Sequence, residues 1–159
     1  MELAASRANL PRASSPEVVG YKSTEPSIGR AEMSKAAKDF KFNLLKLERE
    51  GNMVRAHFEI TNGASGKASF GVSAQGGSSG YSKLIANRKE YRAAEVVIGD
   101  FHGKGYVHKA FYSGAPETGY IVFSGIPTDL RKFDVLVVGY MHRCCGVEGE
   151  FNFDDLDIP

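Results

Sequence analysis

The sequence predicts an all-β protein, most consistent with a β-sandwich of about seven to nine short strands. From Asp39 onward, runs in which apolar and polar residues alternate follow one another at short spacing, and Gly-rich turns separate them. No stretch shows a long helical period. A small barrel fits the same pattern, but the continuous apolar run Phe133–Tyr140 is typical of a central strand buried on both faces, which favours the sandwich.

The N-terminal part of the chain differs in composition from the rest. Residues 1–30 hold three prolines and five serines, and their apolar residues are sparse and show no period. Such a segment cannot bury enough surface to offset its ordering entropy. Residues 31–38 (AEMSKAAK) are good helix formers and predict a short helix, although eight residues are marginal without tertiary support. We therefore expect a flexible arm over 1–38, either a disordered leader or a segment that orders on a partner, and a domain over 39–159.

The domain begins with a predicted hairpin. Its first strand alternates through Phe40 and Leu44, and the apolar phase then slips to Leu45 and Leu47. One extra residue in a strand causes such a slip, so we expect a β-bulge near Leu44 and Leu45. After the turn signal Glu50-Gly51-Asn52, residues 54–61 show the clearest apolar alternation in the chain.

The remaining predicted strands follow in order. They cover residues 70–74, 81–86, 90–98, 106–112, 119–124, 133–140 and 150–158, and the intervening loops include 75–80 and 99–105. We expect one core to contain the inward residues of the hairpin and of the later strands. The residues predicted for it are Val54, Ala56, Phe58, Ile60, Phe123, Phe133, Val135 and Val137.

Charge and composition exclude several classes of protein. The formal net charge is +1, which argues against a nucleic-acid protein held mainly by phosphate contacts. No apolar run approaches the length of a membrane-spanning helix. Residues 1–10 (MELAASRANL) contain no recognisable secretory signal, because Glu2 and Arg7 flank a short apolar stretch. Residues 148–159 carry five acids and no base, but interleaved apolar residues indicate a last strand with a charged outer face.

Several phrases, taken in order, resemble small bacterial immunoglobulin-like proteins whose function is not known. They are DFKFNLLKLEREGNMVRAHFEITN, KEYRAAEVVIGD, SGAPETGYIVFSGIP, KFDVLVVGY and GEFNFDDLDIP. The resemblance covers Asp39–Pro159 and implies an antiparallel immunoglobulin-like sandwich, usually exported, with no catalytic residues to carry over. This chain departs from that group in lacking a recognisable export signal and in carrying Cys144-Cys145. The compartment and the redox state of these cysteines therefore stay open.

The segment His142-Arg143-Cys144-Cys145 contains the densest set of soft metal ligands. Zinc needs about four ligands, usually from two separated pairs, and the sequence has no second pair. Free thiols at a strand end, one buried and one partly exposed, fit the segment better. Asp154, Asp155 and Asp157 do not have the spacing of a calcium loop. We therefore expect no metal site and no cofactor.

No catalytic motif stands out. Ser78, His102 and Asp100 could be combined into a triad, but the chain has no nucleophile elbow around a serine. The glycines of 99–105 do not have the spacing of a phosphate loop. Six tyrosines offer faces for stacking sugars, but the sequence has no tryptophan, and tyrosines are common at sandwich edges; they are Tyr81, Tyr91, Tyr106, Tyr112, Tyr120 and Tyr140.

The sequence favours a non-catalytic binding or structural module that acts through its surface loops, a sheet edge and the N-terminal arm. Two alternatives remain: a virion or assembly component of the decoration type, and a small carbohydrate-binding or metal-dependent protein. We expect a protein partner, or self-association into a homo-oligomer, and neither nucleic acid nor a membrane span. We expect surface recognition and not catalysis, because no acid-base pair, nucleophile motif or complete metal set occurs at usable spacing.

Overall fold

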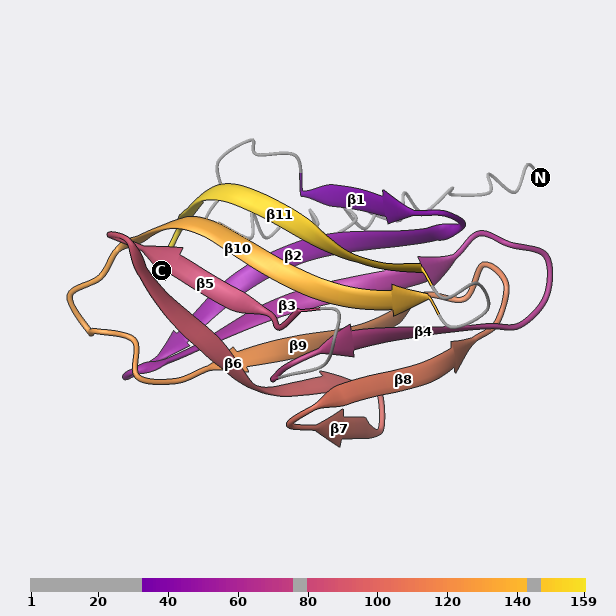
Figure 1. The fold of residues 1–159 in the computed structure, drawn as a ribbon, viewed down its shortest axis with the longest axis horizontal. Coiled ribbons are helices and arrows are strands. Elements are labelled where there is room, and N and C mark those ends of the chain that lie inside the picture. Colours follow the sequence, from indigo (N-terminus) through magenta and orange to yellow (C-terminus); the bar gives the residue numbers. More distant parts are fainter. Residues whose placement is uncertain (1–32, 76–79, 143–146) are drawn as a thin grey trace, which may run out of the picture.

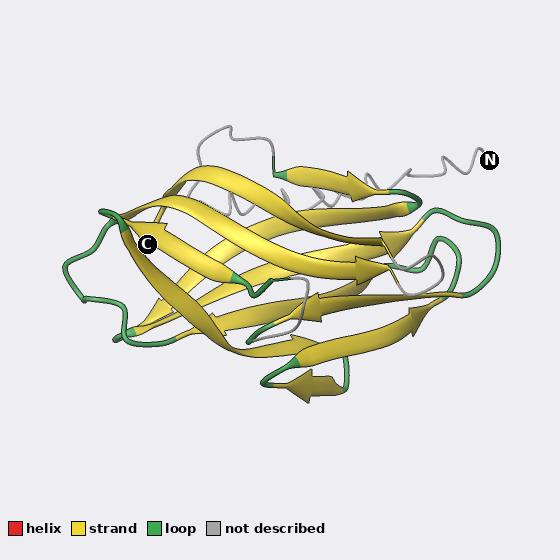
Figure 2. Ribbon diagram, in the orientation of Figure 1, coloured by secondary structure: helices red, strands yellow, loops and turns green. Residues whose placement is uncertain are grey.

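A computed structural model of the chain describes residues 33–75, 80–142 and 147–159. These residues form eleven strands and no helix (Figure 1). The strands are β1 (Ser34–Ala37), β2 (Phe40–Glu50), β3 (Met53–Asn62), β4 (Ala68–Ser73), β5 (Lys83–Ala86), β6 (Lys89–Ile98), β7 (Phe101–Gly103), β8 (Tyr106–Phe111), β9 (Glu117–Phe123), β10 (Lys132–His142) and β11 (Val147–Asp157). Figure 2 shows that mostly short loops and turns connect the strands. The all-β prediction is confirmed.

All pairings between these strands are antiparallel, and they fall into two groups that share β6. The first group runs β1-β2-β3-β9-β6, with β7 also paired to β6. The second group consists of β10, with β11 along one edge and β5 and β4 along the other, followed by β8. β6 pairs with β5 over Lys89–Arg92 and with β9 over Ala93–Ile98, so one long strand connects the groups.

The core lies where the apolar faces of the two groups meet. In β2, the Phe42 ring centroid lies 4.8 Å from that of Phe58 in the same group and 5.4 Å from that of Phe151 in the second group. Phe40 stacks on Phe70 of β4 at 4.7 Å. Since β2 forms no ladder with β4 or β11, these contacts join the groups through side chains alone. Offset and edge contacts of this kind stabilise aromatic cores.

The first hairpin matches its prediction closely. β2 and β3 pair along their whole length, and the register shifts between Leu44 and Lys46, where the bulge was expected. Gly51 in the turn has a φ of 59°, a conformation that glycine adopts without strain. Along β3, buried and partly exposed residues alternate without exception.

The prediction for the continuous apolar run was right about its place and partly wrong about its core residues. β10 is a central strand, with neighbours on both edges. Phe133, Leu136 and Val138 join the main core cluster, whereas Val135 is partly exposed and Val137 is buried outside that cluster. A run that is apolar on both faces gives no phase from which the inward face can be read.

A local irregularity explains why Phe133 and Leu136, three residues apart, share the core. Their partners on β11 are Leu156 and Phe153, which have the same spacing. In both strands, the set of alternate residues that points into the core therefore changes at the same place, while the pairing register is kept. Asp155, between those partners, has a φ of 54°, an uncommon conformation outside glycine.

The N-terminal predictions need two corrections. Where a short helix was expected over 31–38, Ser34–Ala37 form strand β1, which pairs with Phe40–Asn43; residues 1–32 lie outside the described part. Ala37 is buried, so the sheet begins before the domain boundary expected at Asp39. Ladder bonds to β2 supply the tertiary support that an isolated eight-residue helix lacks. β1 and the short β7, which lies in a predicted loop, also raise the number of strands to eleven.

Candidate functional site

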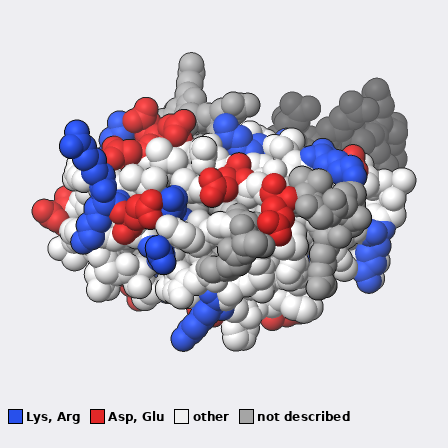
Figure 3. Space-filling model, viewed as in Figure 1, with Lys and Arg blue, Asp and Glu red and all other residues white. Residues whose placement is uncertain are grey.

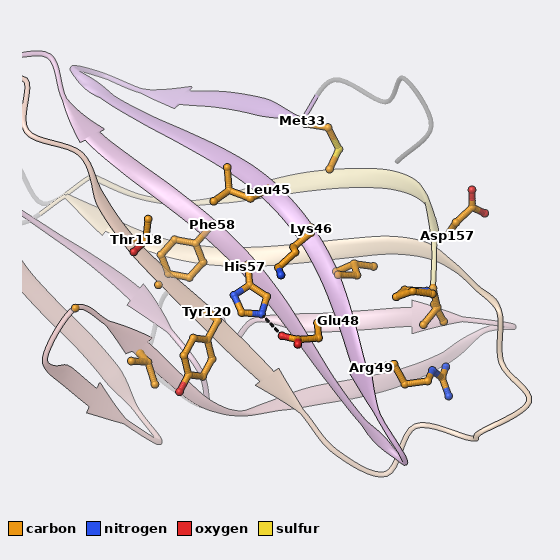
Figure 4. A pocket seen from close by; sticks show the side chains of 16 residues that line it. Met33, Leu45, Lys46, Glu48, Arg49, His57, Phe58, Thr118, Tyr120 and Asp157 are labelled. Carbon is orange, nitrogen blue, oxygen red and sulfur yellow. Dashed lines mark hydrogen bonds and ion pairs between the residues drawn. The ribbon is translucent and has the colours of Figure 1, made fainter. Parts of the chain in front are cut away.

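A groove of about 1480 Å³ lies beside strand β2 (Figure 4). We call it the β2 groove. Its walls include the β2 segment Leu45–Arg49 and three residues at the end of β11, Asp157–Pro159. In Figure 4, β2 runs between a side with His57 and Tyr120 and a side with Met33 and Asp157. We call the first side the floor and the second the edge.

The floor of the groove is a row of side chains across four strands. Lys46 on β2 lies opposite His57 on β3, which lies opposite Tyr120 on β9, and Tyr120 lies opposite Val97 on β6. Side chains opposite one another on neighbouring strands are close enough to interact. The alternation of β3 had placed His57 on the polar face, and its burial pattern confirms this: Ala56 and Phe58 are buried, and His57 is partly exposed.

The bulge in β2 supplies an exposed leucine to the groove. Leu44 is buried, whereas the adjacent Leu45 is 47% exposed. The register shift adds a residue to β2 relative to β3 at this point. The extra residue therefore places a leucine at the surface, beside the row formed by Lys46, His57, Tyr120 and Val97.

A carboxylate and an imidazole form a short polar contact in the groove. Nε2 of His57 lies 2.6 Å from Oε2 of Glu48. This hydrogen bond, helped by the charges of His57, Lys46 and Arg55, lowers the pKa of Glu48 below its ordinary value. The His57 ring also lies 5.5 Å from the Tyr120 ring, centroid to centroid. Glu48 and Tyr120 therefore contact two sides of the same imidazole.

Arg49 anchors the end of β2 to the segment before β10. Its Nη1 donates to the carbonyl oxygen of Pro127 at 3.0 Å, and its Nη2 donates to that of Leu130 at 2.6 Å. Its Nε is buried and has no acceptor among the described residues. Burial and the neighbouring Arg131 charge lower the pKa of Arg49. The groove thus contains one N–H donor with no acceptor in the described part of the chain.

The geometry of His57 differs from that of a nucleophile-activating base. A triad needs a histidine that is oriented by a carboxylate and also hydrogen-bonded to a hydroxyl or thiol. Glu48 provides the carboxylate, but among the described residues no hydroxyl or thiol is hydrogen-bonded to His57. The arrangement can hold the His57 and Glu48 side chains in place on a recognition surface.

Those candidate metal ligands that lie in the described part of the chain do not come together. His142 is buried, 2% exposed, and its ring meets the Phe40 ring edge-on at 4.9 Å, so it belongs to the core. Cys144 and Cys145 lie outside the described residues. Asp155 pairs with Lys132 at 3.0 Å, and Asp157 lines the groove. Residues 33–75, 80–142 and 147–159 contain no group of three or more His, Cys, Asp or Glu side chains that could hold a metal ion.

Among the residues considered for hydrolysis and sugar stacking, those that the structure describes have other contacts. Ser78 lies outside the described residues, and His102 pairs with Glu95, with 3.3 Å between Nδ1 and Oε1. Tyr140 is stacked on Phe151 at 4.2 Å, between centroids. Tyr112 is the most exposed of the large apolar residues, at 66%. Tyr140 and Tyr112 therefore lie in different surroundings, one packed against an aromatic ring of the core and the other at the surface.

A second polar cluster lies on β5 and β6 and is satisfied internally. Glu90 accepts from Nζ of Lys83 at 2.8 Å and from the hydroxyl of Tyr81 at 3.0 Å, and both bonds lower the pKa of Glu90. The Arg92 guanidinium lies over the Tyr81 ring, 4.2 Å from its centroid. Figure 3 shows acidic and basic side chains mixed over the face that carries β10 and β11. A mixed surface of this kind gives no single-sign field to attract a polyanion.

Comparisons with known proteins identify no relative from which a site could be transferred. No protein-family model, curated protein or solved structure gives a significant match to the chain. The described part of the chain contains no helix with the length and apolarity needed to cross a membrane.

Sequence reasoning missed most of the β2 groove. It placed the bulge beside Leu45 and His57 on a polar face, and both signals point to the floor. It gave no sign that Glu48 and Arg49 would form walls together with Asp157, because more than a hundred residues separate them in the chain. Only the pairing order of the strands brings these segments together.

Proposed function

We propose that this protein is a non-catalytic binding module of the immunoglobulin-like β-sandwich type, which recognises an extended polypeptide on the floor of the β2 groove. The sandwich assignment is supported by the two antiparallel groups of strands and by the aromatic contacts between them. Domains of this architecture use their loops, edges and sheet faces as binding surfaces.

The size of the groove is the observation that carries the proposal. Its volume of about 1480 Å³ exceeds the range of about 300–1000 Å³ typical of small-molecule pockets. The floor extends over four strands, with Lys46, His57, Tyr120 and Val97 in one row. An elongated partner fits a surface of this form better than a compact ligand does.

The chemistry of the floor favours a polypeptide partner. Tyr120 and the exposed Leu45 offer apolar contact area, and tyrosine is enriched among the residues that dominate protein interfaces. Around them, Glu48 already contacts His57, and Glu50 already pairs with Arg55. Prearranged polar groups around an apolar centre match the polar rim and buried centre of protein interfaces.

A peptide selection tests this proposal. Phage-displayed peptides would be selected on the full chain, and the affinity of enriched synthetic peptides would be measured by fluorescence anisotropy. We expect Tyr120→Ala to weaken binding about tenfold or more, the effect of removing an interface anchor. Tyr112→Ala is the matched control, because Tyr112 is an exposed tyrosine outside the groove.

Two results would overturn the assignment. Peptides that bind equally well to the parent chain and to Tyr120→Ala would place recognition elsewhere on the molecule. Peptides that are lost with Tyr112→Ala and kept with Tyr120→Ala would do the same. Circular dichroism of each variant separates loss of binding from loss of fold.

A further inference from the structure

We propose that the floor recognises an acidic extended polypeptide, which crosses the strands along one row of side chains and binds more tightly at mildly acidic pH. This inference rests on the proposed function, because it names the chemistry of the partner that the same floor takes. The row, which we call the histidine row, consists of Lys46, His57, Tyr120, Val97 and His102.

The histidine row extends the floor by one strand. In the ladder between β6 and β7, His102 lies opposite Val97, the last residue of the four-strand row. Residues opposite one another in a ladder project from the same face of the sheet. His57 and His102 therefore lie on either side of a centre formed by Tyr120 and Val97. The row contains one lysine and two histidines, and none of its five members is an acid.

Each histidine of the row contacts a glutamate of the adjacent row. Oε2 of Glu48 lies 2.6 Å from Nε2 of His57, and Oε1 of Glu95 lies 3.3 Å from Nδ1 of His102. The histidine side chains are 24% and 72% exposed, so both can meet solvent and a bound partner. The adjacent row consists of Glu48, Arg55, Val122 and Glu95.

Other charged groups near the two histidines have partners of the opposite charge. Arg55 pairs with Glu50 at 2.8 Å, and Lys109 on β8, the strand beside β7, pairs with Glu117 at 2.8 Å. Of the side chains present, only histidine ordinarily changes its charge between about pH 5 and 8. The strands around His57 and His102 carry these charged or titratable groups: Lys46 and Glu48 on β2, Arg55 and Glu59 on β3, Tyr120 on β9, Glu95 on β6, Tyr106, His108 and Lys109 on β8, and Asp100 and Lys104 next to β7.

Protonation of the two imidazoles makes the floor more favourable for an acidic partner. A histidine–glutamate pair has a net charge of −1 when the imidazole is neutral, and no net charge when the imidazole is protonated. The carboxylates of Glu48 and Glu95, which repel an acidic partner at neutral pH, are thereby balanced, while Lys46 contributes a positive charge at both pH values. A protonated imidazole also carries a second N–H, at Nδ1 of His57 and Nε2 of His102, from which a carboxylate can accept.

The spacing of the histidine row specifies the pattern of the partner. Neighbouring strands lie about 4.8 Å apart, so the three spacings from β3 to β7 separate His57 from His102 by about 14 Å. In an extended polypeptide, residues four apart project to the same side and lie about 13 Å apart. Two acidic residues at that separation match the two histidines. The residue midway between them then lies over Tyr120 and Val97, where an apolar side chain fits.

A synthetic peptide with this pattern tests the proposal. The probe contains Glu-Ser-Leu-Ser-Glu, and its neutral control contains Gln-Ser-Leu-Ser-Gln. Dissociation constants would be measured from amide chemical-shift changes of the full chain at about pH 5.5 and about pH 7.5, a range in which glutamates in a free peptide stay ionised. We expect the acidic peptide to bind about tenfold more tightly at the lower pH, and the neutral peptide to bind equally at both.

Variants assign the pH dependence to the histidine row. His57→Gln combined with His102→Gln should remove it, because glutamine gains no charge on acidification, and each single variant should reduce it. His108→Gln is the matched control, since His108 stacks on Tyr106 of β8, outside the histidine row, and this variant should keep the full difference. Circular dichroism at both pH values would show that each variant is folded.

Three results would each overturn the proposal: no shift changes with the acidic peptide at either pH, equal affinity at both, or a pH difference that survives in the double variant. The same difference with the neutral peptide would also overturn it, because pH would then act on the fold. Failure here is distinct from failure of the proposed function. If phage-selected peptides still depended on Tyr120, recognition by the floor would stand, and only the acidic partner would be excluded.

Discussion

The two sides of strand β3 differ: the inward side contributes to the stability of the fold, and the outward side contributes to the proposed recognition surface. The inward side is apolar and has no exposed surface at four successive positions: Val54, Ala56, Phe58 and Ile60. The outward side is polar, and its His57 and Arg55 pair with Glu48 and Glu50 of the neighbouring strand. One strand thus anchors the core through one set of alternate residues and builds the groove floor through the other.

Substitutions one residue apart on β3 should therefore differ in effect: those on the inward side should change the free energy of unfolding, and those on the outward side should change binding. Inward residues gain free energy from burial and close packing, which depend on shape and leave little room for replacement. Outward ion pairs in contact with water contribute little to folding, so their residues can vary with the needs of binding.

The largest effect is expected for the inward residue Phe58. Its side chain has no exposed surface and stacks on Phe42, with centroids 4.8 Å apart. Phe58→Ala should reduce the free energy of unfolding by about 3–5 kcal/mol, through lost burial and the cavity left behind. Thr61→Ala, on the outward side of the same strand, should change it by less than about 0.5 kcal/mol. Urea unfolding of both variants tests the comparison, and similar losses would contradict it.

An intermediate effect is expected where a polar residue occupies the inward side. Asn62 is fully buried, and its amide donates to the carbonyls of Gly66 and Phe111 at 3.0 and 3.1 Å. Its Oδ1 accepts from the Ala64 amide at 2.9 Å. Asn62→Ala should cost about 1–3 kcal/mol in urea unfolding, because the three hydrogen bonds of this fully buried side chain are lost and the buried Phe111 carbonyl loses its donor.

Asn43 provides the control for this prediction. It is an asparagine on the neighbouring strand with one long hydrogen bond, 3.4 Å to Glu59, in a partly buried setting. Asn43→Ala should therefore cost less than Asn62→Ala. Equal costs for the two variants would mean that the Asn62 contacts contribute nothing beyond those of a surface amide.

The sequence predicted those parts of the fold in which local alternation carries the information. The β2–β3 hairpin and its bulge followed from the phase slip at Leu45, and the outward position of His57 followed from the alternation of β3. β1 was mistaken for a helix because its residues favour helices, and only its ladder with β2 overrides that preference. The inward face of β10 could not be read, because an apolar run has no phase.

The groove could not be predicted, because it depends on which strands become neighbours. β3 is followed along its edge by β9, more than fifty residues later in the chain. This pairing brings Tyr120 to His57 and places Gly119 against Phe58. A Cβ added at Gly119 would lie 2.7 Å from Cζ of Phe58, so the glycine is required by a contact that no local pattern reveals.

The smallest effect on stability, and the sharpest on titration, is expected on the outward side. Glu48 has a lowered pKa, chiefly because of its hydrogen bond to His57. His57→Ala should raise the pKa of Glu48 toward the ordinary value of a glutamate, as measured by carbon NMR titration of its carboxyl group. Lys46→Ala should raise it less, because Lys46 acts on Glu48 only through its charge.

The sign of the linked stability change follows from the direction of this shift. A carboxylate whose pKa is lower in the folded state than in the unfolded state stabilises the fold above its unfolded pKa. That contribution is lost as the pH falls through the lower folded value, so the parent chain should lose more stability than His57→Ala across this acidic interval. The difference should be small, because both side chains are partly exposed to water. A Glu48 pKa that stays low in His57→Ala would show that the neighbouring cations, and not the imidazole, hold this carboxylate in its ionised form.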